Sequence, residues 1–290
     1  MAKNKVSAVL GLLTGALVWG LIWYPYRVLE EHGLSGIQAT LATYAVALLL
    51  ALVLFRGRLG RLLRPDLILV LIGLAAGWTN LAYVLGMLHG EVMQVLLLFY
   101  LAPLWTLGFA RLLLGERAGT TGMLIVLLSL VGAVTMLWRP GLRVPVPDTL
   151  AEWFGLSAGV AFALSNVLIR KAAHHSIPLK STAAFAGAVL LTAAMLPFEG
   201  VGPAGWQPLA DTPPLWLVPT VGLVLMATNI GVQHGLNTLS ANQAIVILLT
   251  ELVVAALSAF LLAGETMRWN EYAGGAMIVA ATLLSGRLAH

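Results

Sequence analysis

One carboxylate in this sequence, Glu251, lies deep inside a long apolar stretch, where it could bind and release a proton. Placing a charged carboxylate at the centre of a bilayer costs about 2.5–3.5 kcal/mol on insertion scales, so such residues generally serve a function. An acid beside a cavity could couple the movement of a solute to a proton gradient. The alternative is a protonated, hydrogen-bonded acid with a structural role, and the sequence leaves both open.

Aromatic side chains form a second group with binding chemistry. Five of them lie well inside apolar stretches in the first half of the chain: Trp19, Trp78, Tyr83, Tyr100 and Trp105. Contacts between rings contribute about 0.5–1.5 kcal/mol beyond area burial, and Trp faces also attract cations. These rings could therefore bind a flat apolar solute, or they could fill the protein interior or face lipid.

Amide side chains form a third group, made up of Asn80, Asn166, Asn229 and Gln233. An amide in hydrocarbon needs hydrogen-bond partners, which it finds on a neighbouring helix or on a polar solute. We expect the four amides to orient the polar end of a solute, with helix linkage as the alternative for the pair Asn80 and Asn229. His234, in contrast, is expected to be a surface or packing residue.

Motifs of soluble enzymes are absent from the sequence. We find no phosphate-binding P-loop, no HExxH zinc helix, no GxSxG nucleophile and no EF-hand loop. The absence of Cys excludes disulfides and thiolate catalysis. His174 and His175, next to Arg170, Lys171 and Lys180, indicate a solvated loop rather than a metal site. We therefore expect no enzyme activity, no cofactor and no metal.

Composition places these residues in a membrane protein. Of the 290 residues, 60% are hydrophobic and 10% are charged, with a mean hydropathy of +0.93, whereas about a quarter of the residues of a soluble protein are charged. Apolar surface on this scale must face lipid. The net charge of +4 does not indicate a nucleic-acid partner, because basic residues in membrane proteins sort by side of the bilayer.

The chain divides into apolar stretches that are each long enough to cross a bilayer. We predict an all-α membrane protein with ten transmembrane helices, at residues 7–28, 36–55, 66–88, 92–114, 120–138, 152–170, 181–197, 215–236, 242–263 and 271–288. Pro103 predicts a kink in the fourth helix. If the N-terminus is cytoplasmic, most Lys and Arg residues fall in cytoplasmic segments, which places both termini on that side.

The chain also repeats itself. A shift of 149 positions aligns the third and fourth helices with the eighth and ninth, so that Thr79-Asn80, Gln94 and Gly115-Glu116 fall on Thr228-Asn229, Gln243 and Gly264-Glu265. A shift of 144 aligns the first helix with the sixth. We predict two five-helix repeats, at 1–144 and 145–290. Because five is odd, the second repeat is inverted in the membrane, an arrangement on which alternating access is commonly built.

Two five-helix halves, each with a fourth helix that ends in Gly-Glu, resemble the EamA type of the drug/metabolite transporter superfamily. The resemblance implies a secondary transporter in the bacterial inner membrane, with a small-molecule substrate and the lipid bilayer as its partners. A monomer is compatible with the sequence. Glu116 and Glu265 are expected to tie helix ends to neighbouring turns.

Function is expected where the two repeats differ. The five rings of the first repeat have as counterparts Ala163, Ala227, Val232, Leu249 and Val254, whereas polar residues such as Asn166, Gln233 and Glu251 lie opposite apolar ones. A cavity between such halves suits a solute with a flat apolar body and a polar end. The resemblance implies an exporter of aromatic amino acids, and this asymmetry supports it. The alternative is an exporter of organic cations, drugs or other amphipathic metabolites, and a rival of another class is an intramembrane enzyme using His234 and Glu251.

Overall fold

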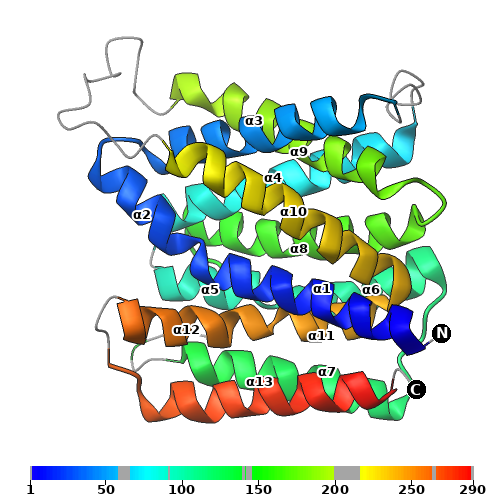
Figure 1. The fold of residues 1–290 in the computed structure, drawn as a ribbon. Helices are drawn as coiled ribbons and strands as arrows, with labels where there is room; N and C mark the ends of the chain where they lie inside the picture. Colours follow the sequence, from blue (N-terminus) through cyan, green and yellow to red (C-terminus); the bar gives the residue numbers. More distant parts are fainter. Residues whose placement is uncertain are drawn as a thin grey trace.

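The fold was analysed in a computed structural model, which describes residues 2–57, 66–90, 92–138, 141, 146–198, 216–262 and 266–288. All regular elements of these residues are helices. Figure 1 shows them lying roughly alongside one another, with α3 and α9 on one side of the bundle and α7 and α13 on the other. Both termini lie at the same end of the bundle, which we call the terminal end.

The first half of the chain contains six α-helices and a π-helix before α7 closes it. These elements are α1 (Ala2–Leu21), α2 (Trp23–Glu31), α3 (Gly36–Phe55), α4 (Leu67–His89), α5 (Val92–Phe99), α6 (Ala102–Phe109), the π-helix η2 (Ala110–Leu114) and α7 (Thr120–Leu137). The first predicted helix thus forms two elements, α1 and α2, which meet at Ile22.

The second half follows the same plan. Its elements are α8 (Leu150–Lys171), α9 (Ile177–Met195), the short 3-10 helix η3 (Leu196–Phe198), α10 (Leu217–Thr238), α11 (Ala241–Leu248), α12 (Thr250–Leu262) and α13 (Trp269–Leu288). α9 begins four residues earlier than the prediction of 181–197, because Pro178 fits the first turn of a helix. The predicted Gly264-Glu265 helix end lies outside the described residues.

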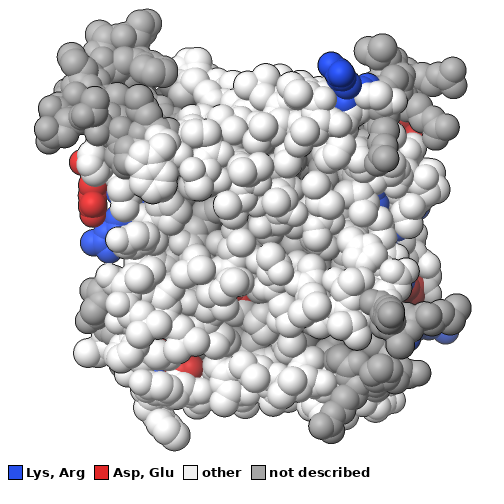
Figure 2. Space-filling view, in the orientation of Figure 1, with Lys and Arg blue, Asp and Glu red and all other residues white. Residues whose placement is uncertain are grey.

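Nine helical spans in the described parts of the chain are long and apolar enough to cross a membrane. The tenth predicted segment forms α13, which packs against α7. Large apolar side chains are exposed on the outside of the bundle, for example Leu112, Leu190 and Leu261. The face shown in Figure 2 is mostly uncharged, and its charged side chains lie mainly near the two ends of the helices. This distribution fits a protein whose sides face lipid.

The fourth and ninth predicted helices are both interrupted. The fourth breaks at Tyr100 and Leu101, between α5 and α6, and Pro103 follows within the first turn of α6. This confirms the kink predicted from Pro103, which has no N–H to continue the helix. The ninth breaks at Leu249, between α11 and α12, without a proline. Leu249 stands 149 positions after Tyr100, the offset found between the two halves of the sequence.

Helix pairing repeats between the two halves. α4 packs against α8 and α9, and its counterpart α10 packs against α1 and α3. Glycine permits the closest of these contacts: a Cβ at Gly187 of α9 would overlap the backbone of Gly73 in α4, and a Cβ at Gly11 of α1 would overlap Gly231 in α10. These helices therefore approach each other backbone to backbone, as small residues allow in membrane proteins.

Candidate functional site

The two helix breaks meet at a hydrogen bond. Tyr100, at the break after α5, donates its hydroxyl proton to Glu251 Oε1 over 2.6 Å, and Glu251 lies in the first turn of α12. α1 closes the region from another side, because a Cβ at Gly20 would lie 2.7 Å from the backbone oxygen of Glu251. The tyrosine and the carboxylate thus join the fourth helix of one half to the fourth helix of the other.

A group of rings surrounds this hydrogen bond, and we call it the ring cluster: Trp19, Tyr83, Phe99, Tyr100 and Phe162. Phe99 lies at its centre. The centroid of the Phe99 ring is 5.2 Å from that of Tyr83, 5.1 Å from that of Tyr100 and 5.6 Å from that of Phe162. Trp19 of α1 contacts Phe162 edge-on at 6.1 Å. Phe162 packs against three separate apolar clusters of the core. The cluster therefore links α1, α4, α5 and α8 at mid-depth.

The space beside the ring cluster is small in this conformation. A cavity of about 10 Å³ is lined by Tyr100, Ala102, Phe162, Ile245, Leu248, Leu249 and Glu251. It can hold about one water molecule, whereas a cavity that binds benzene measures on the order of 150 Å³. The site is thus closed, and a solute could enter it only if rings of the cluster moved.

Two of the five predicted rings lie apart from the cluster. Trp78 is 38% exposed, donates its indole N–H to Ser157 Oγ over 3.2 Å and packs against Phe154. Trp105 on α6 is also 38% exposed. Sequence spacing alone did not separate these two rings from Trp19, Tyr83 and Tyr100.

The predicted amides divide into two kinds. Asn80 links two helices: it donates to the Ala76 carbonyl of its own helix at 2.8 Å, and it accepts a hydrogen bond from the Tyr44 hydroxyl of α3 at 2.7 Å. This contact links helices, the alternative considered for Asn80. Asn229 instead accepts from Gln233 of its own helix at 2.9 Å.

Gln233 and Asn166 retain hydrogen-bonding capacity. Gln233 is fully buried and also donates to Ser181 Oγ over 3.0 Å, but its Oε1 has no partner among the described residues. Asn166, one turn beyond Phe162 on α8, is 6% exposed, and its Nδ2 is likewise unpaired. A buried, unpaired polar atom costs about 1–3 kcal/mol, so these two amides are suited to bind a polar group.

The terminal end carries an ionic network between the halves. Glu116 forms an ion pair with Arg170 and accepts a hydrogen bond from the Ala241 N–H of α11 at 3.0 Å. Arg170 also donates to the carbonyl of Leu239, just after the end of α10. The expectation that Glu116 ties a helix end to a neighbouring turn is confirmed. Positive groups near helix C-termini are favourable because of the helix dipole.

Lys180 corrects a prediction. It was expected in a solvated loop, but it lies inside the first turns of α9 and is fully buried. Its Nζ donates to the Ile169 carbonyl at 2.9 Å and to Asn237 Oδ1 at 2.5 Å. The reason is the earlier start of α9, which turns Lys180 toward the ends of α8 and α10.

His234 also lies toward the terminal end, where its Nε2 is 3.0 Å from the Ser7 hydroxyl of α1. Ser7 and Gly20 are both on α1, and Gly20 contacts the backbone of Glu251. Thirteen residues of helix correspond to roughly 20 Å, so His234 and Glu251 do not form one catalytic site. Among the described residues, no group of three or more His, Asp and Glu side chains could hold a metal ion.

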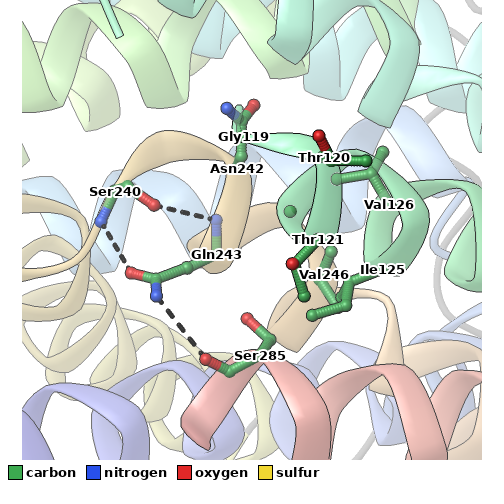
Figure 3. A pocket seen from close by; sticks show the side chains of 11 residues that line it. Gly119, Thr120, Thr121, Ile125, Val126, Ser240, Asn242, Gln243, Val246 and Ser285 are labelled. Carbon is green, nitrogen blue, oxygen red and sulfur yellow. Dashed lines mark hydrogen bonds between the residues drawn. The ribbon is translucent and has the colours of Figure 1, made fainter. Parts of the chain in front are cut away.

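A larger pocket of about 270 Å³ lies at the terminal end between α7, α11 and α13. Figure 3 shows its polar lining, in which Gln243 joins Ser240 and the Ser285 carbonyl through hydrogen bonds. Thr120, Thr121 and Asn242 complete the polar part of the wall. Gln243 also caps the start of α11, where it forms a capping box with Ser240.

Sequence reasoning missed Phe99, Phe162 and Tyr44. A signal for the first two was present: Phe99 and Phe162 fall on Leu248 and Val18 under the offsets of 149 and 144. Both therefore differ between the repeats in the same way as the rings that were chosen. Tyr44 gave no signal, because its partner Asn80 is 36 residues away and only folding brings them together.

Comparison with known proteins defines the class of this architecture. The sequence profile of the EamA-like transporter family matches the chain twice, over residues 6–138 and 149–287. An uncharacterised transporter of Archaeoglobus fulgidus is 30% identical over 230 residues, covering 77% of this chain and 78% of its own. An uncharacterised transporter of Pseudomonas aeruginosa is 27% identical over 250 residues, covering 80% and 78%.

A crystal structure with 18% sequence identity superposes with a TM-score of 0.77 and covers 98% of both chains, so it shares the fold. The chain belongs to the EamA-like transporter family. It is a multi-pass membrane transporter and not an enzyme, and its class implies a small-molecule substrate.

Proposed function

We propose that this protein is a secondary transporter that exports aromatic amino acids across the bacterial inner membrane by alternating access, with both termini in the cytoplasm. The observation that carries the proposal is the ring cluster, closed around the Tyr100–Glu251 hydrogen bond where two broken helices meet. The aromatic content also resembles that of the aromatic amino acid exporter YddG of the same superfamily.

The transport cycle in this proposal uses two inverted five-helix halves, residues 1–144 and 145–290. Their equivalent breaks, 149 positions apart, and their equivalent helix pairs support this arrangement. Each broken helix can bend where its ladder of hydrogen bonds is interrupted. Bending at both breaks would separate the rings on one side of the bundle or the other, which suits a site that opens to each side in turn.

Within this site, Trp19, Tyr83 and Tyr100 contact the ring of the substrate, together with the newly found Phe99 and Phe162. Asn166 and Gln233 orient its polar end, because each has a buried polar atom without a partner. Trp78, Trp105, Asn80 and Asn229 support the site from its margin. A solute ring that replaces one ring of the cluster would keep the aromatic contacts that the closed site already makes.

The direct test is counterflow in proteoliposomes loaded with phenylalanine. Labelled external phenylalanine should accumulate transiently, and leucine should compete weakly. Phe99→Ala should reduce the exchange strongly, whereas Phe198→Ala, at a side chain that is 79% exposed, should leave it unchanged. Absence of exchange for phenylalanine, tyrosine and tryptophan would refute the proposed substrate class.

Export of organic cations is the second candidate, and Glu251 is the observation that favours it. A carboxylate next to several aromatic faces is the arrangement that binds quaternary ammonium groups. A quaternary amine should compete poorly with phenylalanine under the main proposal. If the amine instead exchanges rapidly while phenylalanine does not, the cation exporter is the correct function.

Glu251 is proposed to couple export to protons, because it is the acid at the junction of the two breaks and its only described partner is a tyrosine hydroxyl. Glu251→Gln keeps the size and a hydrogen-bonding oxygen but removes the titrating group. The variant should lose stimulation of transport by a pH gradient and retain counterflow, which needs no net proton movement. An unchanged pH response would assign Glu251 a structural role.

A further inference from the structure

The helices α6, α8 and α11 pack against one another. Two apolar clusters lie at successive levels where they meet. Ala102 of α6, Ala163 of α8 and Ile245 of α11 belong to one apolar cluster. Nearer the terminal end, Ala110, Val167 and Ala241 belong to another. On each helix, one position between the two clusters lies within four residues of both. A polar side chain at that level, which we call the layer, has apolar side chains of both clusters as neighbours.

Polar side chains occupy this level on all three helices: Thr106, Asn166 and Asn242. Thr106 is fully buried, and Asn166 and Asn242 are 6% and 9% exposed. Thr106 Oγ1, Asn166 Nδ2 and Asn242 Oδ1 have no hydrogen-bond partner among the described residues. Each unpaired buried atom costs about 1–3 kcal/mol, so each of the three atoms calls for a partner.

The chemistry of the three atoms selects that partner. A hydroxyl donates and accepts, Asn166 Nδ2 donates, and Asn242 Oδ1 accepts. An anion would be repelled by the Oδ1 atom, and a metal cation by the N–H groups. Water satisfies all three, since buried water typically makes about three hydrogen bonds to polar groups that lack other partners.

The layer is also connected to the outside. Asn242 lines the pocket of about 270 Å³ at the terminal end, and Figure 3 shows it at the edge of that pocket beside Gly119 and Thr120. In the other direction, Thr106 is six residues from Tyr100 along the broken helix, roughly 9 Å at helical rise. The layer therefore stands between the terminal-end pocket and the Tyr100–Glu251 hydrogen bond.

We propose that Thr106, Asn166 and Asn242 bind ordered water and form a hydrated layer that continues the terminal-end pocket toward Glu251. The layer itself follows from the buried polar atoms. Its role, the access of protons to Glu251 from the terminal end, rests on the proposed function. A substrate that reaches Asn166 would displace part of this water.

Silver ion tests the layer, because it is small, hydrated and specific for thiols, and because the protein has no cysteine of its own. Thr106→Cys, Asn166→Cys and Asn242→Cys are exposed to silver nitrate in chloride-free detergent solution, and the remaining thiol is counted after denaturation. Ala102→Cys, Ala163→Cys and Ala244→Cys are matched controls on the same three helices, at side chains that are at most 1% exposed.

We expect silver to consume the thiols of the layer at least tenfold faster than those of the controls. Rates within threefold of the controls would overturn the hydrated layer. Thr106→Cys replaces the hydroxyl by a thiol and removes only one methyl group, so it carries the test even if the asparagine variants do not fold, which gel filtration reports. No gradient and no substrate are involved, so this result stands or falls independently of transport.

Transport tests the role of the layer separately. Thr106→Val preserves shape and removes the hydroxyl, and the ratio of pH-driven transport to counterflow should fall several-fold. If the thiols react rapidly but this ratio is unchanged, the assigned role in proton access is wrong. If Glu251→Gln also leaves the pH response intact, it is the proposed coupling that fails, and the hydrated layer remains.

Discussion

The mid-depth site and the terminal end hold the two halves of this transporter together in opposite ways. At mid-depth the halves meet through the rings packed on Phe162 and through the hydrogen bond between Tyr100 and Glu251. At the terminal end they meet through Glu116, which forms an ion pair with Arg170 and accepts a hydrogen bond from the Ala241 N–H, while Arg170 itself bonds a helix end within the second half. Rings can slide and be replaced by the ring of a solute, whereas bonds to charged groups hold a fixed geometry.

The difference indicates that the mid-depth site is suited to bind a solute. The terminal end is suited to act as a lock, which means a set of contacts that keeps this end closed. Ionic contacts at the terminal end must break before that end can open, and they can do so where water is near. Charged pairs at mid-depth would be far harder to separate. Four substitutions test this contrast, and we give them in order of expected effect.

Phe162→Ala should have the largest effect, because Phe162 packs against three core clusters. We expect a loss of about 3 kcal/mol in stability, the low end of the range for removing a core ring because Phe162 is half-buried, measured by thermal unfolding in detergent. The enlarged site should also admit bulkier solutes in competition assays. Phe198→Ala, whose side chain is 79% exposed, is the control. A neutral result at Phe162 would mean that the cluster does not hold the halves together.

Glu116→Gln should cost about 2 kcal/mol, in the range for a hydrogen bond to a charged group. The variant leaves Arg170 without its carboxylate partner while the bond to the Ala241 N–H can persist. If the network is a lock, transport should speed up as stability falls, because the terminal end opens more easily. Reduced stability together with slower transport would contradict the lock and indicate a scaffold.

Tyr100→Phe removes the hydroxyl that bonds Glu251 and keeps the ring in the cluster. A stability loss of about 1 kcal/mol is expected, the typical value for a single hydrogen bond. Counterflow of phenylalanine should survive, since the aromatic contact is retained, whereas the pH response should change. An equal loss of both activities would show that the hydroxyl positions substrate rather than the acid.

Asn80→Leu should have the smallest effect, about 0.6 kcal/mol, the average for hydrogen bonds between membrane helices. A double-mutant cycle with Tyr44→Phe isolates the bond, because both changes remove the same contact. The two losses should be strongly non-additive and transport should be nearly normal. Additive losses would mean that the two side chains act separately. A severe transport defect would indicate that Asn80 contacts the substrate.

The predictions from the sequence agree best with the structure for features that depend on residues close together in the chain or on the repeat. The approximate positions of the spans and the kink before Pro103 depend on neighbouring residues, and the tie at Glu116 was expected from the repeat; the structure confirms all three. The break at Leu249 was not predicted, because it has no proline. It could have been inferred by carrying the break at Tyr100 across the offset of 149.

The sequence by itself determined that the chain spans a membrane, that its halves correspond, and that rings and one acid are concentrated inside it. Hydropathy and repetition settle these points because the bilayer admits few architectures. Only the tertiary structure decided which rings share one cluster, that Tyr100 meets Glu251, and that Lys180 is buried. Those facts depend on the rotation of each helix about its axis, which is fixed by close contacts such as Gly11 against Gly231 between segments far apart in the chain.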